Sequence, residues 1–285
     1  MYVGIDFGLS NLDAVAMPAP SAPLHEWRTV TLRGRHMPSE ATVRAALEAL
    51  AVEWSEARII AVTGGQHRML PGVLRGTVLF KANELEAAGR GGLHLARSAR
   101  PSLEAATVAS CGSGTAVVAV RGRSVSHVSG SAVGGGTLLG LSRLLIGSTD
   151  PHEVDMLARQ GNPNAIDLSL RDAVGGAIGR LPAEATAVNF GRVPLLERLE
   201  LAHADLAAAI VTMVAQVVGV TAVSAARAES LFPIVFVGHL VDMISVRRVL
   251  EEVAQLYDAG MLIPELPGYA TAVGALLLAA EGLPR

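Results

Sequence analysis

The chain has 285 residues, a length that suits one large domain or two smaller lobes. Its 23 basic and 26 acidic side chains give a formal net charge of -3, so neither a nucleic acid nor an anionic membrane is the expected partner. The single cysteine, Cys111, excludes an intrachain disulfide and a cysteine metal cluster. No basic segment precedes a long apolar run at the start, so we expect no signal peptide and a cytoplasmic location.

The first part of the chain alternates short apolar runs with helical patterns. Residues 2–7 and 12–17 are apolar runs on either side of a glycine-containing turn, which predicts two antiparallel strands. Ser39 precedes apolar residues at helical spacing from Val43 to Trp54, so it is the expected N-cap of a helix. Further strands are predicted at 27–32, 59–62 and 78–80, and a helix is predicted from Glu84.

A strand–turn–strand pattern recurs in the middle of the chain. Residues 108–111 form an apolar run that leads into a Gly-Ser-Gly turn, and residues 115–120 return as a second apolar run. The recurrence is the main internal repeat of the sequence. It predicts two lobes, residues 1–105 and 106–285, each of which opens with a hairpin.

The second half is richer in helical patterns. Leu206–Ala226 is the most apolar stretch, but it contains Gln216 and runs into Arg227, so a buried helix is favoured over a membrane span. Because strands and helices alternate along the chain, the sequence belongs to the α/β class. The other predicted elements are helices at 137–145, from 150 onward, at 241–257 and at 269–280, and strands at 233–237 and 261–263.

The turn that follows Asp6 is the first candidate phosphate-binding element. An aspartate at a strand end positions Mg²⁺ through the water shell of the metal. The small residues Gly8, Ser10 and Asn11 leave backbone N–H groups free to face phosphate oxygens. The alternative is an ordinary hairpin whose aspartate stabilises the turn, and the motif alone does not separate the two interpretations.

The second hairpin carries a similar turn, formed by Gly112, Ser113, Gly114 and Thr115. A phosphate-facing turn in each lobe would clamp a nucleotide between them, although an ordinary hairpin is again the alternative. A Rossmann site fits less well because the segment after Gly114 has a strand pattern, whereas that site needs the N-terminus of a helix.

Two later segments are also candidates for ligand contact. Gly134, Gly135 and Gly136 precede a helix, so a ligand could approach their backbone closely and meet helix N–H groups; a flexible loop is the alternative. Gly238 follows a buried strand, at a position where α/β sheets commonly hold ligands.

In combination, these segments resemble the phosphate and adenosine elements of the actin-like ATPase superfamily, and within it the chain is similar to the type II pantothenate kinases, or Fumble-like family. Thr63-Gly64-Gly65 resembles their Thr-Gly-Gly segment, residues 84–91 resemble the stretch headed by their catalytic glutamate, and residues 130–141 resemble their glycine-rich loop and helix. The similarity continues at 155–168 and 187–191. The resemblance implies a duplicated, ribonuclease H-like α/β fold with two lobes around a nucleotide cleft.

The family transfers the γ-phosphoryl group of MgATP to the primary hydroxyl of pantothenate, the first step of coenzyme A synthesis. Carried over, the resemblance makes Glu84 the general base and Asp6 the residue that organises Mg²⁺ through water, with ATP and Mg²⁺ as cofactors. Gly238 would lie near the adenosine. The implied phosphate contacts are Gly8, Ser10, Asn11, Gly112, Ser113, Gly114, Thr115, Gly134, Gly135 and Gly136, and the implied substrate contacts are Arg90, Ser113, His127 and Gly130.

Several positions depart from the family pattern, among them Ser110-Cys111, which stand before the second Gly-x-Gly where the family has an Asn and an aliphatic residue. Leu9 stands where the family has a second glycine, Asp13 where it has a lysine, and His127 where it has the arginine that holds the pantothenate carboxylate. A neutral imidazole lacks the forked, bidentate contact of a guanidinium. The sequence therefore leaves three functions open: a kinase for pantothenate or a related hydroxy compound, a catalytically altered or regulatory homologue that binds nucleotide or acyl-CoA without turnover, and an ATPase that drives a partner enzyme.

The resemblance also implies partners. A pantothenate-like small molecule is the expected substrate, and CoA or an acyl-CoA is a candidate effector. The family forms homodimers through the long helices of its second lobe, so a homodimer is expected, with Leu206–Ala226 as the candidate contact.

Overall fold

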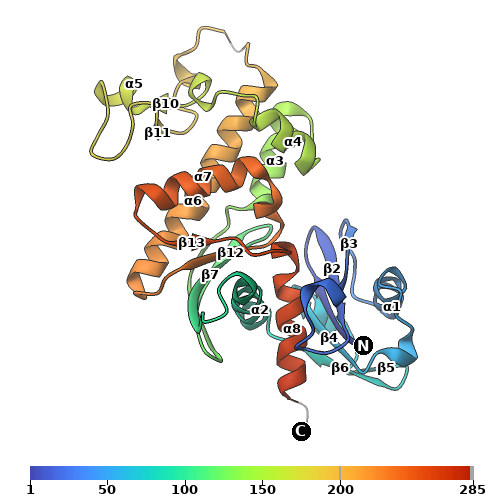
Figure 1. Ribbon diagram of the computed structural model, residues 1–285. Helices are drawn as coiled ribbons and strands as arrows, with labels where there is room; N and C mark the ends of the chain where they lie inside the picture. The colour runs from blue at the N-terminus through green and yellow to red at the C-terminus, as the bar shows by residue number, and fades with distance from the viewer. Residues whose placement is uncertain (199, 283–285) are drawn as a thin grey trace.

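The computed structural model describes residues 1–198 and 200–282. In these residues it contains two large sheets, with helices between and around them, and a small two-stranded one (Figure 1). The first sheet has six strands in the order β3-β2-β1-β4-β6-β5. It is antiparallel across β1, β2 and β3 and parallel across β1, β4 and β6. Its strands are β1 (Tyr2–Phe7), β2 (Asn11–Met17), β3 (Arg28–Arg33), β4 (Ile59–Gly64), β5 (Val73–Leu74) and β6 (Thr77–Lys81).

The second sheet repeats this topology. Its order is β13-β12-β7-β8-β9, again with an antiparallel hairpin, a third antiparallel strand and two parallel strands beyond the first. The predicted internal repeat is thereby confirmed, and it extends over five strands of each sheet. The strands are β7 (Ala105–Cys111), β8 (Thr115–Arg121), β9 (Ser124–Ser131), β12 (Ile234–Val237) and β13 (Met261–Leu262).

The helices largely follow the sequence predictions. Ser39 caps the first helix, with its side chain accepting from the Thr42 N–H. That helix ends at Ala49 rather than near Trp54, because Ala51 adopts a left-handed φ of 52° and turns the chain away. The helices are α1 (Glu40–Ala49), α2 (Glu84–Ala99), α3 (Gly135–Ile146), α4 (Pro151–Ala158), α5 (Leu170–Val174), α6 (His203–Ala228), α7 (Ile244–Leu256) and α8 (Ala270–Glu281).

Some elements are not predicted by the sequence. Strand β9 is one of them, because its residues alternate weakly in hydrophobicity and its last two belong to the segment 130–141 that resembles the glycine-rich loop. The segment between α4 and α6 projects from the body (Figure 1) and holds a small pair of strands, β10 (Leu168–Ser169) and β11 (Thr186–Val188). These short strands are below the length at which periodicity is readable.

The two inner helices are exchanged between the predicted lobes. Helix α2 packs on β7, β8 and β12 of the second sheet, whereas α8, near the end of the chain, packs on β1 and β4 of the first (Figure 1). The helices pack on each other between the sheets. The predicted boundary between residues 105 and 106 therefore separates the sheets but not these helices.

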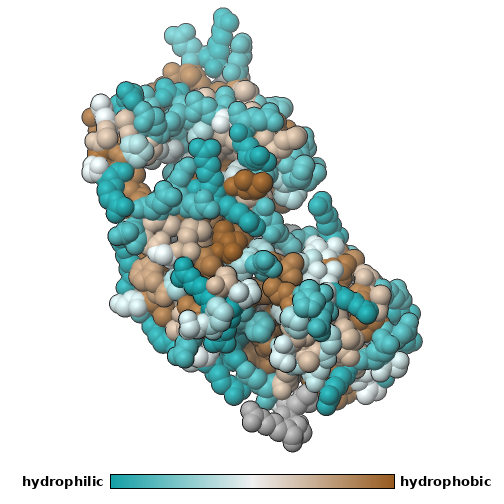
Figure 2. Space-filling view, in the orientation of Figure 1, coloured by the Kyte–Doolittle hydropathy of each residue, from teal (hydrophilic) through white to brown (hydrophobic). Residues whose placement is uncertain are grey.

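Helix α6 covers the outer face of the second sheet together with α3 and α7. Among the described residues it alone is long and apolar enough to span a membrane, and 72% of its most apolar stretch is buried. The predicted buried helix is thus confirmed. On the face shown in Figure 2, hydrophobic residues gather in patches among hydrophilic ones.

The contact between α2 and α8 depends on glycines, and this can be tested. A Cβ at Gly91 would overlap the Ala270 carbonyl, and one at Gly274 would overlap the Ala87 carbonyl. We expect Gly91→Ala to lower the free energy of unfolding by about 1–3 kcal/mol, since the helices must separate. Urea denaturation followed by circular dichroism measures this change.

Gly140→Ala on α3 is the matched control. Apart from its chain neighbours and the backbone of its own helix, no described atom lies within 4 Å of an added Cβ there. Alanine should therefore leave stability unchanged or raise it by up to about 1 kcal/mol through helix propensity. Equal losses from the two substitutions would contradict the close packing of the inner helices.

Candidate active site

The two predicted phosphate turns meet in space. One lies between β1 and β2 and the other between β7 and β8, and the hydroxyl oxygens of Ser10 and Ser113 are 3.1 Å apart. We name them the first bend (8–10) and the second bend (112–114). Residues from hairpins that begin far apart in the chain thus share one small volume, as a clamp around a single ligand requires.

The carboxyl ends of the parallel strands bring three further positions to the same edge. Asp6 is the penultimate residue of β1, Gly64 ends β4, and Glu84 begins α2 after β6. Gly64 has a φ of 93°, and a Cβ there would lie 2.6 Å from Asp6 Oδ1, so only glycine leaves room for the carboxylate. Glu84 is exposed, and its helix is capped by Asn83, whose side chain accepts from the Glu86 N–H.

Asp6 is electrostatically unsatisfied. Its Oδ1 is buried without a hydrogen-bond partner among the described residues. Burial and the carboxylates of Glu84 and Asp13 raise the pKa of Asp6 to about 8, while His239 acts in the opposite direction. A hydrated cation would give the Asp6 Oδ1 atom a hydrogen-bond partner and would offset the neighbouring carboxylate charges. Asp6 therefore fits the predicted role with Mg²⁺. In the part of the chain that the structure describes, no cluster of three His, Cys, Asp or Glu side chains could hold a metal, so the cation would depend on phosphate and water oxygens.

The glycine-rich segment supports the second bend. The Gly135 N–H donates to the Gly112 carbonyl at 2.8 Å, and the Gly136 N–H donates to the Ser113 carbonyl at 2.9 Å. A Cβ at Gly134 would lie 2.8 Å from the Gly114 backbone. The structure therefore uses these two N–H groups to hold the bend, which differs from the sequence expectation that they point at a ligand. Thr115 reinforces the contact, because its hydroxyl donates to the Val133 carbonyl.

The predicted substrate residues separate into two groups. His127 and Gly130 lie together on β9, where a Cβ at Gly130 would be 3.6 Å from His127 Nε2, and both are exposed. The structure does not bring Arg90 to them. Its guanidinium pairs with Glu281 at the end of α8, which Arg123 also contacts. The spacing of Arg90 along α2 turns it toward α8 rather than toward the bends.

Gly238 holds the second sheet against the second bend. It has a φ of 97°, and any Cβ would overlap the Cys111 carbonyl just before Gly112. Burial raises the pKa of the Cys111 thiol to about 12, so this cysteine is an inert core residue.

Sequence reasoning missed one group beside the bends. The His239 imidazole lies between two carboxylates, with Nε2 2.9 Å from Asp13 Oδ1 and Nδ1 2.7 Å from Asp242 Oδ2. We call these three residues the His239 bridge. The only local signal was the spacing of His239 and Asp242 in the 3₁₀ turn 239–242, since Asp13 is distant in sequence.

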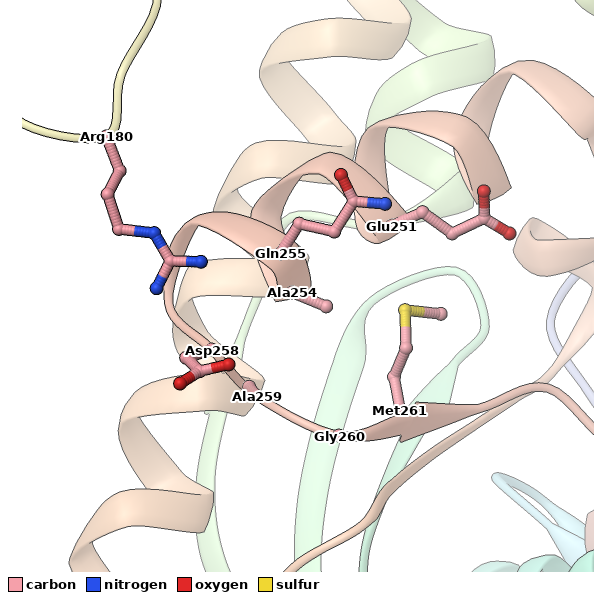
Figure 3. A pocket seen from close by; sticks show the side chains of 8 residues that line it. All are labelled: Arg180, Glu251, Ala254, Gln255, Asp258, Ala259, Gly260 and Met261. Atoms are coloured by element: carbon pink, nitrogen blue, oxygen red, sulfur yellow. The ribbon is translucent and has the colours of Figure 1, made fainter.

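Two cavities among the described residues lie away from the bends. One of about 380 Å³ sits at the C-terminal end of α7, where Arg180 extends across from the projecting segment (Figure 3). A second of about 960 Å³ lies between that segment, α6 and α7. Neither is lined by a predicted site residue, so the candidate active site is the open junction of the two bends.

Solved structures with the same architecture define the class. The activator of the 2-hydroxyisocaproyl-CoA dehydratase from Clostridium difficile with bound ADPNP has a TM-score of 0.66 at 15% identity, with 100% of this chain and 99% of that chain covered. A ROK family glucokinase from Streptomyces griseus, in complex with glucose and AMPPNP, has a TM-score of 0.59 at 12% identity, with 98% and 99% covered. The fold is the duplicated, two-lobe α/β fold of the actin-like ATPases, as predicted.

Sequence comparison identifies the family. A profile of the Fumble family matches residues 105–278, more than half of the chain, so the chain belongs to that family. The type II pantothenate kinase of Bacillus cereus (strain G9842) is 25% identical over 224 residues, which cover 78% of this chain and 82% of that protein. The type II pantothenate kinase of Staphylococcus aureus (strain USA300) is 29% identical over 234 residues, with 80% and 86% covered. The predicted resemblance is confirmed.

The His239 bridge predicts a pH-dependent stability. Burial opposes protonation of His239, but the hydrogen bonds and charges of Asp13 and Asp242 outweigh it and raise the pKa to about 10. A raised pKa means that the folded state holds a proton that the unfolded state has lost. The stabilisation is therefore complete below the unfolded pKa of 6.5 and is lost as the pH rises toward 10.

The measurement is urea denaturation of the wild type and of His239→Gln at pH 7 and pH 10. We expect the wild type to lose about 3 kcal/mol more than the variant over this range. Identical losses would show that His239 is not protonated in the folded protein.

Proposed function

We propose that this protein is an ATP-dependent kinase that transfers the γ-phosphoryl group of ATP to the primary hydroxyl of pantothenate or of a related small molecule. The observation that carries the proposal is the meeting of the two bends at Ser10 and Ser113, beside the edge that holds Asp6 and Glu84. Membership of the Fumble family and the type II pantothenate kinases among its relatives support the same reaction.

Each part of the site has a task in this proposal. Phosphoryl transfer needs mainly positioning and charge stabilisation. Backbone N–H groups of the two bends would cradle the phosphates. Asp6 would hold Mg²⁺ through its water shell, and bound Mg²⁺ supplies positive charge to the phosphate oxygens. Gly238, packed against the second bend, would lie near the adenosine.

Glu84 would accept the proton of the attacking hydroxyl. Its side chain is exposed and close enough to Asp6 to raise the pKa of that residue. It lies in the first turn of α2, where the positive end of the helix dipole attracts a carboxylate. A carboxylate next to the phosphate bends is the group that general base catalysis requires.

The acceptor would be bound by Ser113 in the second bend and by the exposed residues His127 and Gly130 on β9. A neutral imidazole offers a single donor to a carboxylate, whereas an arginine offers a fork. We therefore propose that the acceptor is pantothenate or a pantothenate-like alcohol whose polar end is held by a single hydrogen bond from His127 rather than by a bidentate contact.

We also propose a cytoplasmic homodimer with CoA or an acyl-CoA as effector. The family relationship supports the proposal. Most of α6 is buried within one chain, and Val220 is its exposed large apolar side chain among the described residues. Further exposed apolar side chains that a second copy could cover lie on α3 and α4: Leu144, Leu145 and Met156.

Substitution of Glu84 tests the kinase. The purified protein is incubated with MgATP and a panel of pantothenate-like hydroxy acids and amides, and phosphorylated product is detected by mass. Glu84→Gln should lower turnover by about 10²- to 10⁴-fold, since it removes the base but keeps the shape. Calorimetry with a non-hydrolysable ATP analogue should show retained nucleotide affinity.

Glu86→Gln is the matched control, because Glu86 lies in the same helical turn but on another side of α2; it should keep full activity. Nucleotide binding without product from any acceptor would support the regulatory homologue instead. A chain that binds no nucleotide would refute both.

A further inference from the structure

A row of polar side chains crosses the first sheet on the face toward the inner helices. Asp13 lies directly opposite Asp6 on β1 and opposite Thr31 on β3. Like charges in directly opposite positions destabilise a sheet, and a buried carboxylate needs a partner. Asp13 is only 5% exposed. The Thr31 hydroxyl donates to Asp13 at 2.6 Å, and the His239 imidazole is the cationic group that pairs with it among the described residues.

Residues 268 and 269 pack against the His239 ring. A Cβ at Gly268 would overlap the imidazole, so the ring lies against a bare Cα. The edge of the ring meets Tyr269, with centroids 6.0 Å apart. The Tyr269 hydroxyl also lies 3.1 Å from that of Thr31. Two polar contacts, side by side, therefore join β2 and β3 to the 3₁₀ turns at 239–242 and 267–269.

The His239 bridge is attached directly behind both bends. On one side, Asp13 belongs to β2, which begins at Asn11 as the first bend ends. On the other side, His239 follows Gly238, whose Cα packs against the Cys111 carbonyl just before the second bend. A displacement of the His239 ring from Asp13 would therefore move one bend relative to the other.

We propose that His239 is a positioning residue that fixes the spacing of the two bends by joining Asp13 to Asp242. The consequence for ATP rests on the proposed kinase function, whereas the fixed spacing is a property of the fold and is measurable without any ligand.

The spacing is tested by distance measurement between spin labels. Cysteines are introduced at Glu48 on α1 and Arg143 on α3, which are exposed residues on the two sides of the junction. Cys111 is fully buried with a raised pKa, so a thiol reagent spares it. In the ligand-free protein, His239→Gln should broaden the distance distribution. An unchanged distribution in a folded variant would overturn the proposal.

Gly268→Ala provides a second variant in case His239→Gln does not fold. It should broaden the distribution as well, since it displaces the ring while keeping every charge. Glu229→Gln is the control, because it breaks the exposed ion pair with Arg121 away from the bends; it should leave the distribution unchanged. A comparable change in Glu229→Gln would show that any lost ion pair loosens the protein, which would also overturn the proposal.

The effect on the nucleotide is tested with a double-mutant cycle. Asp13→Asn and His239→Gln should each weaken binding of a non-hydrolysable MgATP analogue about tenfold, and the double variant should be no weaker than either, because the two residues act through one contact. Additive losses, or weaker binding with unchanged spacing, would overturn the positioning role. A wild type that binds no analogue would refute the kinase function, while the label distances would still decide whether the bridge fixes the bends.

Discussion

Close packing of α2 against α8 is the constraint on which the rest of the structure depends. Gly91 and Gly274 each place a bare Cα against a carbonyl of the opposite helix, so the helices approach more closely than larger side chains would allow. Because α2 lies on the second sheet and α8 on the first, their contact sets the distance between the sheets. That distance brings the two hairpin ends near enough for the hydroxyls of Ser10 and Ser113 to lie 3.1 Å apart.

Much of the fold could be predicted because its elements are strongly patterned. The hairpins at 2–17 and 105–121, the Ser39 cap and the buried α6 all follow from apolar periodicity and turn chemistry. Strand β9 could not be predicted, since its polar residues carry little alternation and its sheet neighbour provides the hydrogen bonds. The sequence also could not predict that α2 covers the second sheet and α8 the first, because no local pattern indicates which sheet a helix will cover.

The candidate site shows the same division. Turn residues and strand ends indicated the two bends, and parallel pairing explains why Asp6 and Glu84 share an edge. The sequence did not reveal that the N–H groups of Gly135 and Gly136 donate hydrogen bonds to the second bend, or that Glu281 pairs with Arg90. In the sequence, Asp13 is notable only because it stands where the family has a lysine. In the fold, His239 from the second half of the chain pairs with the Asp13 carboxylate. Pairings between distant segments decide these roles.

The exchanged helices also determine how the chain can be divided. A cut between residues 105 and 106 would leave the first sheet without α8 and the second without α2, so each fragment would expose an apolar sheet face to water. Neither fragment would fold on its own. The two fragments would reassemble only if α2 of the first packed on the second sheet and α8 of the second packed on the first sheet. The two halves of the chain therefore fold as one cooperative unit. Their strand orders are alike, but each sheet needs a helix from the other half to cover it.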